Sequence, residues 1–383
     1  MFFKISQNQD LLFPNNYKLG KYWFSCDNGW TKITKDQKNY FIKGYIDDFS
    51  SHEQIINQFD SLEPGSSGNF ALICFDQDLV TVTHNKLRSF PLWASTDEVT
   101  NMYQTGESIW ADCYLVIDNW QINKQIITPY TKEPLTEIDI ETGVERIKNI
   151  LIDKTKSLHS CKLDIKLFLS GGVDTMLLYA LLKHQKIDHE LIDYFHQDKD
   201  EFLCKNYQQI EKQHWGYTQI HHWKNPVLFP TGSCGDEYFL RGPYTAGVWA
   251  SWHEFDVIDI LKKDTVGFYH RDYFLGNSNR LAFETAKQDA KNIKTKHELN
   301  YSLINNLVND HQHWHYGNTI TWTPFHDIDI LKIVLSINPD QLLYQTLDAK
   351  LNKMLIEQLY PDLLNYVSTQ KNINNMQNIY KLF

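Results

Sequence analysis

The spacing of the apolar residues changes abruptly near the middle of the chain, between Ile165 and Lys183. A short apolar run, Ile165, Leu167, Phe168 and Leu169, has no helical period and is typical of a buried parallel strand. A Ser-Gly-Gly turn follows at 170–172, where glycine lets the backbone close on a ligand. From Val173 onward the apolar residues recur with helical spacing. The stretch therefore predicts a strand, a glycine turn and a helix whose free N–H groups form an anion site.

The chain after residue 135 alternates between short apolar runs and longer amphipathic segments. The short runs predict strands at 165–169, 190–195 and 227–229. The amphipathic segments predict helices at 136–156, 173–183, 200–214, 328–337 and 350–359, with Thr136 as the N-cap of the first. This alternation predicts an α/β fold, a parallel sheet with helices on both faces and a ligand at the carboxyl ends of its strands.

The chain before residue 130 is dominated by β-rich runs instead. Strands are predicted at 40–46, 69–75 and 79–84, the last two joined as a hairpin around 76–78. A short helix is expected at 52–59. The change of pattern predicts a smaller β-rich domain at 1–130 and an α/β domain at 131–383, and 383 residues suffice for two substantial cores.

Composition and charge narrow the class of protein. The net charge of −10 does not favour nucleic acid as a partner. The six cysteines are scattered without a CxxC motif, which fits reduced thiols better than disulfides or a zinc site. No apolar run approaches the roughly 18 residues that a membrane span needs, and no signal peptide is visible. We expect a cytoplasmic protein without a membrane partner, and its oligomeric state cannot be read from the sequence.

The turn after the central strand carries the first chemical motif, Ser170-Gly171-Gly172-Val173-Asp174-Thr175. No Gly-Lys-Ser/Thr follows, so this is not a Walker loop, and Asp174 beside phosphate suggests bound Mg²⁺. The motif resembles the pyrophosphate-binding (PP) loop of the ATP pyrophosphatases. The resemblance implies that ATP and Mg²⁺ are the cofactors, that Asp174 is a metal ligand and that the strand ending at Phe195 flanks the adenine. The implied ATP-binding residues are Leu169, Ser170, Gly171, Gly172, Asp174, Thr175, Phe195 and Gly232.

A second motif follows the strand predicted at 227–229, in the sequence TGSCGDEYF from Thr231 to Phe239. It resembles the SGEGSDE-F loop of asparagine synthetase and its relatives. Position by position, Asp236 takes the place of the second Mg²⁺ ligand. With Asp174 it would supply the hard oxygen donors that Mg²⁺ prefers. Ser233 stands where the family has a catalytic glutamate, so the general base is expected elsewhere, with His253, Glu254 and Asp256 as unranked candidates.

A third match lies between His315 and Asp327 and is similar to the family's G-E-x-R-x-PF-x-D segment. Pro324, Phe325 and Asp327 match, whereas Ile320 and Trp322 replace the family's glutamate and arginine. Further on, Lys371 is the best counterpart of the family lysine that reaches the reacting centre, and a tail lysine in solvent is the rival interpretation. Histidines 221, 222, 311, 313 and 315 are expected in solvent or in the core rather than on a metal.

The N-terminal part is similar, between about residues 40 and 95, to the class II glutaminase (Ntn-type) domain of asparagine synthetase. That domain uses an N-terminal cysteine as nucleophile and its own amine as base. This chain begins with Met1, and Cys26 lies inside it. We therefore expect a degenerate glutaminase-like domain, as in β-lactam synthetase, or an unrelated β-rich domain.

Together the motifs predict an asparagine synthetase-like ligase without glutaminase activity. It would adenylate a small-molecule or peptide carboxylate, releasing pyrophosphate, and transfer the acyl group to ammonia or an amine. Lys371 and Ser233 are the catalytic candidates. Lasso-peptide cyclases show that such a scaffold accepts intramolecular amines, so the substrates stay open. The alternatives are a non-catalytic nucleotide-binding descendant and a PP-loop enzyme that modifies a nucleobase or tRNA.

Overall fold

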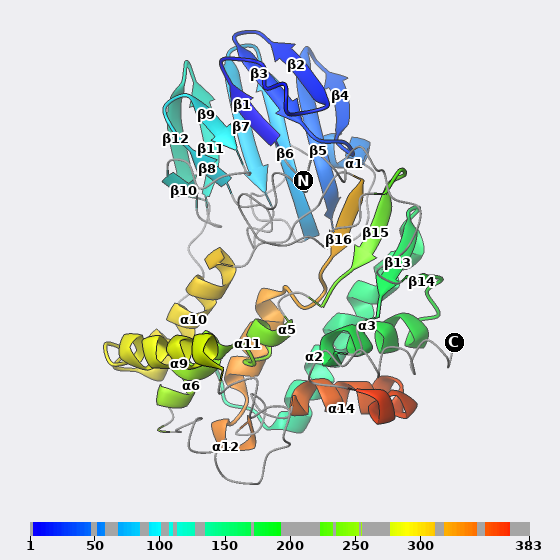
Figure 1. Cartoon of the computed structure of the whole chain (residues 1–383), viewed down its shortest axis with the longest axis vertical. Helices are drawn as coiled ribbons and strands as arrows, with labels where there is room; N and C mark the ends of the chain where they lie inside the picture. Colours follow the sequence, from blue (N-terminus) through cyan, green and yellow to red (C-terminus); the bar gives the residue numbers. More distant parts are fainter. Residues whose placement is uncertain are drawn as a thin grey trace.

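The computed structural model describes fourteen stretches of the chain. They are residues 3–46, 52–57, 68–84, 92–100, 107–109, 113–126, 135–169, 172–192, 223–232, 235–252, 254, 276–310, 318–342 and 349–367. These stretches build two six-stranded antiparallel sheets from the first part of the chain and a four-stranded parallel sheet with helices from the second. In Figure 1 the antiparallel sheets lie above and the helices below.

The two antiparallel sheets contain twelve strands. The first sheet has the order β10-β8-β9-β1-β3-β2 and the second β12-β11-β7-β6-β5-β4. Their bounds are β1 Phe3–Ser6, β2 Asn15–Leu19, β3 Tyr22–Cys26, β4 Thr31–Lys35, β5 Lys38–Ile46, β6 Gly68–Asp76, β7 Leu79–His84, β8 Leu92–Ala94, β9 Glu98–Thr100, β10 Glu107–Ile109, β11 Cys113–Asp118 and β12 Gln121–Ile126. The β6–β7 hairpin and strand β5 confirm the strand predictions, and helix α1 (His52–Asn57) confirms the short helix over the described residues.

An aromatic core holds the two sheets face to face. Phe24 of β3 lies 4.4 Å from Phe41 of β5 and 5.9 Å from Phe75 of β6, measured between ring centroids. All three rings are buried. Because alternate residues of a strand point to the same face, each strand contributes its inward side chains to this one layer. The result is a β-sandwich, which we call the sandwich below.

The parallel sheet has the order β14-β13-β15-β16, and every neighbouring pair is parallel. Its strands are β13 Asp164–Phe168, β14 Glu190–Ile192, β15 Val227–Pro230 and β16 Thr319–Trp322. The predicted strands at 165–169, 190–195 and 227–229 are confirmed over the residues that the structure describes. Ile165, Leu167 and Leu228 point to the main core, whereas Phe168 and Phe229 pack on the opposite face around Trp223.

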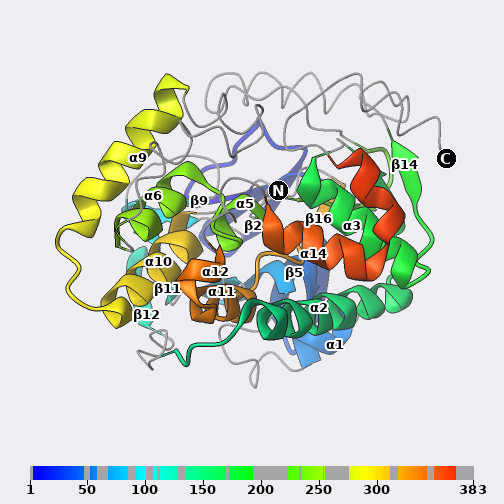
Figure 2. The same ribbon diagram turned by 90° about the horizontal axis from the view of Figure 1, so that it is seen from below.

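The helices of this part pack into the main core. They are α2 Ile140–Lys156, α3 Val173–His184, α5 Gly235–Tyr238, α6 Pro243–Trp252, α9 Asn277–Ala290, α10 Lys296–Asp310, α11 Ile328–Ser336, α12 Pro339–Leu342 and α14 Lys350–Leu359, with 3-10 turns at Ser157–Ser160 and Pro361–Tyr366. Figure 2 shows α14 against α3 and α6 beside α9, two pairs that are in contact. The predicted helix at 200–214 lies outside the described residues, so helices on the second face stay a prediction.

The predicted N-cap of α2 is wrong by three residues. Asp139 caps the helix instead, its carboxylate accepting a hydrogen bond of 2.6 Å from the Thr142 N–H. Thr136 precedes a segment that pairs with the end of α11, where Ile138 forms a parallel bridge with Ile337. These backbone bonds hold the chain extended up to Asp139, which delays the start of the helix.

The sandwich contacts the parallel sheet directly. Asn69 of β6 donates a 3.1 Å hydrogen bond to the Thr321 carbonyl of β16, and the Thr323 N–H lies 3.5 Å from the Tyr45 hydroxyl. Tyr45 belongs to the core of the helical part although it lies on β5. Both contacts lie at the carboxyl end of β16, a strand that is also in contact with β5. Residues 127–134 lie outside the described stretches, and the division at 130 stays a prediction.

No helix in the described ranges is long and apolar enough to cross a membrane.

Candidate functional site

The candidate site lies where β13 and β15 end. Because the two strands are parallel neighbours, the segments that follow them emerge at the same edge of the sheet. The first segment leads through Gly172, the N-cap of α3, to Asp174 in the first turn of that helix. The second leads through Gly232 to Asp236 in the short helix α5. The topology therefore brings Asp174 and Asp236, the two predicted metal ligands, to the same edge of the parallel sheet.

Arg241 joins the two carboxylates. Its Nη1 atom lies 2.9 and 3.1 Å from the two oxygens of Asp174 and 2.9 Å from Oδ1 of Asp236. The arginine side chain is 9 % exposed, against 18 % for Asp174 and 41 % for Asp236. One guanidinium group therefore serves two carboxylates at the boundary between core and solvent. We call these three residues the Asp–Arg–Asp cluster.

Asn352 of α14 supports the cluster through Asp174. Its Nδ2 atom donates a 2.9 Å hydrogen bond to Oδ1 of Asp174. The residue is fully buried on α14, which packs against α3. The orientation of the Asp174 carboxylate is therefore fixed by two donors from different elements, which is how a functional side chain is held in one rotamer.

Two glycines let the second loop approach Asp174. A Cβ atom on Gly232 would lie 2.8 Å from the Cβ of Asp174, and one on Gly235 would lie 2.6 Å from its Oδ1. Both distances are too short for any side chain. The Gly235 N–H also donates to the Gly232 carbonyl at 3.0 Å, which closes the turn tightly. Glycine at 232 and 235 is therefore required by contact with Asp174 and not only by the turn.

The pKa of Asp174 is raised to about 7. Burial is the main cause, because it penalises the charged carboxylate; Arg241 lowers the pKa, and Asp236 and Glu237 raise it again. The carboxylate is thus less stable as an anion than an exposed aspartate, even with an arginine in contact. A carboxyl group whose pKa is shifted in this way, at the end of parallel strands, is typical of functional sites.

The donor set of the cluster fits Mg²⁺. Carboxylate oxygens are the ligands that Mg²⁺ prefers, usually one or two from protein with the rest from water and phosphate. Within the described stretches no group of three His, Cys, Asp or Glu side chains is gathered for a metal. Asp174 and Asp236 are the two carboxylates of the cluster that could hold such an ion, and the guanidinium group of Arg241 contacts both.

The described residues bring together several of the predicted ligands. Gly232 lies against Asp174 and the Thr175 backbone, and Asp236 meets Asp174 through Arg241. Thr175 donates its hydroxyl to the Gly172 carbonyl at 3.0 Å, inside the first turn of α3. Leu169 is buried in the core at the end of β13. The remaining candidates, Ser170, Gly171, Phe195, Ser233 and Lys371, lie outside the described residues.

Part of the third sequence match, residues 318–327, lies within the described stretches. Asp327 caps α11, accepting hydrogen bonds of 2.7 and 3.1 Å from two N–H groups, and forms a 3.0 Å ion pair with Lys154. Ile320 and Trp322 are buried in the core on β16. Of the base candidates only Glu254 is described, and it is exposed with a φ of 59°. His253, Asp256 and the histidines at 221, 222, 311, 313 and 315 fall outside the described part of the chain.

Sequence reasoning missed Arg241 and Asn352. Arg241 lies 67 positions from Asp174 along the chain, and no local pattern links the two. A signal for Asn352 does exist: it occupies a position on the buried face of α14, among Leu351, Leu355 and Ile356. A fully buried polar side chain needs a hydrogen-bond partner, so an amide at an apolar helix position points to a polar site.

The sandwich holds a different charged cluster. Lys43 and Asp27 are both completely buried, with Nζ 3.1 Å from each carboxylate oxygen, and Trp30 donates a 3.0 Å bond to the same carboxylate. Cys26 is buried next to them, and burial with the charge of Asp27 raises the pKa of its thiol strongly. A neutral, inaccessible thiol is a poor nucleophile.

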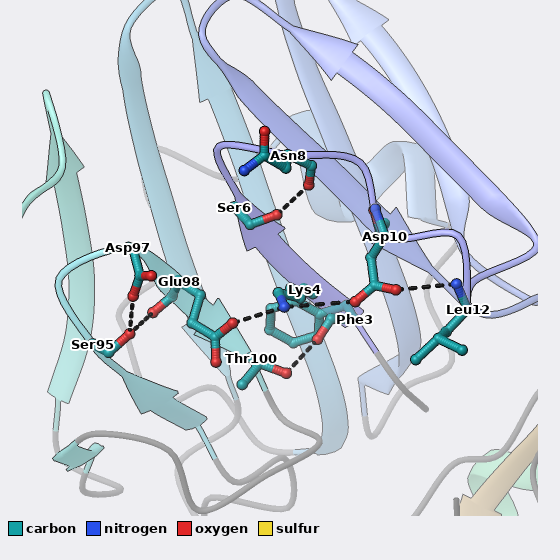
Figure 3. A network of polar contacts seen from close by, with 11 residues as sticks. Phe3, Lys4, Ser6, Asn8, Asp10, Leu12, Ser95, Asp97, Glu98 and Thr100 are labelled. Atoms are coloured by element: carbon teal, nitrogen blue, oxygen red, sulfur yellow. Dashed lines mark hydrogen bonds and ion pairs between the residues drawn. The ribbon is translucent and has the colours of Figure 1, made fainter.

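A third polar network lies on the outside of β1 and is shown in Figure 3. Lys4 forms ion pairs of 2.8 Å with Glu98 and 3.5 Å with Asp10. Asp10 also accepts a 3.0 Å bond from the Leu12 N–H, which ties down the loop after β1. An open hollow of 520 Å³ lies beside these residues. The three side chains are only 16 to 21 % exposed, and their ion pairs tie the loop after β1 and strand β9 to β1, which indicates a structural network.

Comparison with known proteins gives distant likenesses only. No family model matches the chain, and no curated protein matches it. Among solved structures, the chain is similar to glutamine phosphoribosylpyrophosphate amidotransferase from B. subtilis in complex with ADP and GMP, with 8% identity, 64% of this chain and 77% of that chain covered and a TM-score of 0.25. A structure described as the allosteric regulatory enzyme of purine biosynthesis matches at 10% identity, covering 60% and 68%, with a TM-score of 0.22. Likeness at this level does not assign the chain to a family.

Proposed function

We propose that the chain is an ATP-dependent amide-forming ligase whose nucleotide and Mg²⁺ bind at the ends of β13 and β15. The observation that carries the proposal is the meeting of Asp174 and Asp236, which come from two different strand–helix turns. The N-terminus of α3 begins beside them, and its helix dipole favours a negatively charged ligand there. A triphosphate with its cation matches this combination of N–H donors and carboxylates.

The reaction has two steps. In the first, an oxygen of the substrate carboxylate attacks the α-phosphorus of ATP, a new P–O bond forms and pyrophosphate leaves. In the second, the nitrogen of an amine or ammonia attacks the acyl carbon, AMP leaves and the nitrogen loses a proton to a base. Products are the amide, AMP and pyrophosphate. Mg²⁺, when bound, neutralises the charge that develops on the leaving pyrophosphate.

The chain's own groups have separate tasks in this scheme. The N–H groups of the first turn of α3 hold phosphate oxygens, and Asp174 with Asp236 orients the cation. Asn352 and Gly232 fix Asp174 in position. Lys371 would stabilise the oxyanion or the departing AMP, and Ser233 would act in place of the family glutamate; both lie outside the described residues. By the resemblance, Leu169 to Gly172, Thr175 and Phe195 would contact the nucleotide.

The sandwich does not supply ammonia from glutamine in this proposal. The amine base of an N-terminal nucleophile is absent at Cys26, which lies inside β3. Cys26 is 1 % exposed, and the raised pKa of its thiol keeps it protonated. Ammonia release from glutamine by the purified protein would contradict this part.

The test is an assay for adenylation with a trap. The protein is incubated with ATP, Mg²⁺, hydroxylamine and pools of small carboxylates, amino acids and peptides, and AMP, pyrophosphate and hydroxamate are measured. We expect all three products to depend on one pool. Asp174→Ala should abolish them, whereas Asp164→Ala, at the exposed opposite end of β13, should not. Equal turnover in the Asp174→Ala variant would contradict the proposed site.

One observation favours a second function. Arg241 already occupies the carboxylate oxygens that a catalytic cation would need, which favours a chain that does not carry out the reaction. Binding of MgATP without AMP in any substrate pool would support this non-catalytic alternative.

A further inference from the structure

The position of Arg241 raises a question about the cation site. Its Nη1 atom is 2.9 to 3.1 Å from three carboxylate oxygens of Asp174 and Asp236. A Mg²⁺ ion lies about 2.1 Å from its oxygen ligands and demands a nearly ideal octahedral shell. An ion bonded to those oxygens would be crowded by the guanidinium group and repelled by its charge. The two cations cannot share the same oxygens.

We propose that Arg241 is a built-in cation which holds Asp174 and Asp236 together and gives up its place when a divalent cation binds. This inference rests on the proposed function, because it takes the carboxylate pair as the cation site. It adds a residue that no sequence motif indicated. It also makes displacement of the guanidinium group a part of cation binding.

The charges of the surroundings favour such an exchange. Two carboxylates face one guanidinium, and Glu237 adds a further negative charge near Asp174. The cluster therefore keeps a negative charge that a single arginine does not balance. Because 41 % of the Asp236 side chain is exposed, a cation from solvent can reach this carboxylate. A divalent ion would balance this charge better than the single positive charge it displaces.

The backbone around Arg241 is strained. Leu240, directly before it, has a φ of 58° and is buried, a conformation that β-carbon-bearing residues adopt at a cost. The turn reverses the direction of the chain, and the N–H groups of Arg241 and Gly242 both donate to the Asp236 carbonyl. The same turn brings the guanidinium to the Asp236 side chain. Strain of this kind persists at switch and ligand positions, where the surrounding structure holds it.

After displacement, the guanidinium group of Arg241 could bind phosphate oxygens of the nucleotide. Its planar donors suit phosphate oxygens, which arrive with the nucleotide at the N-terminus of α3. Cation and nucleotide binding should then support each other, because ATP gives Arg241 new acceptors after it leaves the carboxylates. Divalent cations alone should bind weakly, and nucleotide should tighten them.

The first test measures Mn²⁺ binding by electron paramagnetic resonance, with and without ATP. Wild type is compared with Arg241→Met and with the control Arg146→Met, an exposed arginine on α2. Without ATP, we expect Arg241→Met to bind Mn²⁺ at least about tenfold more tightly than wild type, a difference of about 1.4 kcal/mol. The control should match wild type, and ATP should tighten Mn²⁺ binding more in wild type than in Arg241→Met.

The outcomes separate the inference from the proposed function. Equal or weaker Mn²⁺ binding in Arg241→Met, with binding intact in wild type, would overturn the role of Arg241 alone. Absence of Mn²⁺ binding in every variant, even with ATP, would overturn the cation site and the inference together.

A second measurement uses only the wild-type protein and therefore does not depend on whether a variant folds. The chain has only five arginines, namely Arg88, Arg146, Arg241, Arg271 and Arg280, so their guanidinium groups can be followed by nitrogen-15 NMR after selective labelling. Titration of the wild-type protein with Mg²⁺ should move one buried guanidinium signal toward the position of a solvated arginine. Saturation with Mg²⁺ and no change in any guanidinium signal would overturn the proposal.

Discussion

The molecule contains two charge clusters that balance their charges differently. In the sandwich, Lys43 and Asp27 form a completely buried pair of one cation and one anion. At the end of the parallel sheet, Asp174 and Asp236 share Arg241, so anions outnumber the cation, and Asp236 reaches solvent. A completely buried pair whose charges cancel cannot bind a further ion from solvent. The unbalanced, open cluster can accept a cation, and this difference separates a structural charge pair from a candidate site.

The largest expected effect is on the closed pair. Lys43→Met leaves Asp27 charged and buried, and breaking a buried pair in this way costs about 3–5 kcal/mol of unfolding free energy. The matched control is Lys38→Met on the same strand, whose 3.1 Å pair with Asp76 is one third exposed and should cost less than about 1 kcal/mol. Urea titrations measure both. Adding Asp27→Asn to Lys43→Met should recover part of the loss, and a cost below that of Lys38→Met would show that the pair is not structurally important.

The next effect tests how closely the site is packed. Gly235→Ala puts a Cβ 2.6 Å from Oδ1 of Asp174, and overpacking of this kind costs about 1–3 kcal/mol. Because the clash is with the carboxylate itself, MgATP binding should weaken together with the thermal midpoint. Calorimetric titration and thermal scans give both values. A variant with unchanged nucleotide affinity would show that Asp174 does not need its position for binding.

A smaller effect on stability is expected at Asp236. Asp236→Asn leaves Arg241 with one full carboxylate partner, so the cluster becomes balanced like the pair in the sandwich. In metal-free buffer the stability should stay within about 1 kcal/mol of wild type, as for a partly exposed ion pair, while AMP formation is lost. Chemical denaturation and the adenylation assay together test this separation. A large loss of stability would mean that Asp236 is mainly structural.

The smallest effect concerns pH and lies in the sandwich. His52 accepts from Thr31 and donates to the Gly44 carbonyl, and burial lowers its pKa. The unfolded chain therefore takes up a proton at a higher pH than the folded chain does. Stability should be fully present above the unfolded pKa of about 6.5 and decrease as the pH falls below it. His52→Gln should flatten this slope in denaturation curves between pH 7.5 and 5, and an unchanged slope would assign the effect to other groups.

The sequence predicted the local elements well because their signals are local. The strand ending at Phe168 and the helix beginning at Val173 follow from apolar spacing within twenty residues. The start of α2 was predicted wrongly because Thr136 is a good cap by itself, whereas the pairing of Ile138 with the distant Ile337 keeps it extended. Long-range contact, rather than propensity, decided that boundary.

The same limit applies to the candidate site. The sequence pointed to the two carboxylates through the family resemblance of the two loops, and the structure brings both to Arg241, while their role as metal ligands stays a prediction. Arg241 was not found, because its contact with Asp174 depends on how two turns meet in space and on the unusual φ of Leu240. Ser233, Phe195 and Lys371 stay predictions. The sandwich pair was missed for a similar reason, since Lys43 lies in an apolar run and its partner Asp27 is sixteen positions earlier.

The most direct measurement compares the affinity for ATP with and without Mg²⁺, in wild type and in Asp174→Asn. If the two carboxylates hold the cation of a bound nucleotide, wild type should bind MgATP far more tightly than metal-free ATP. Asp174→Asn should lose most of that difference while binding metal-free ATP as well as wild type or better. Equal affinity of wild type for ATP with and without Mg²⁺ would contradict the site.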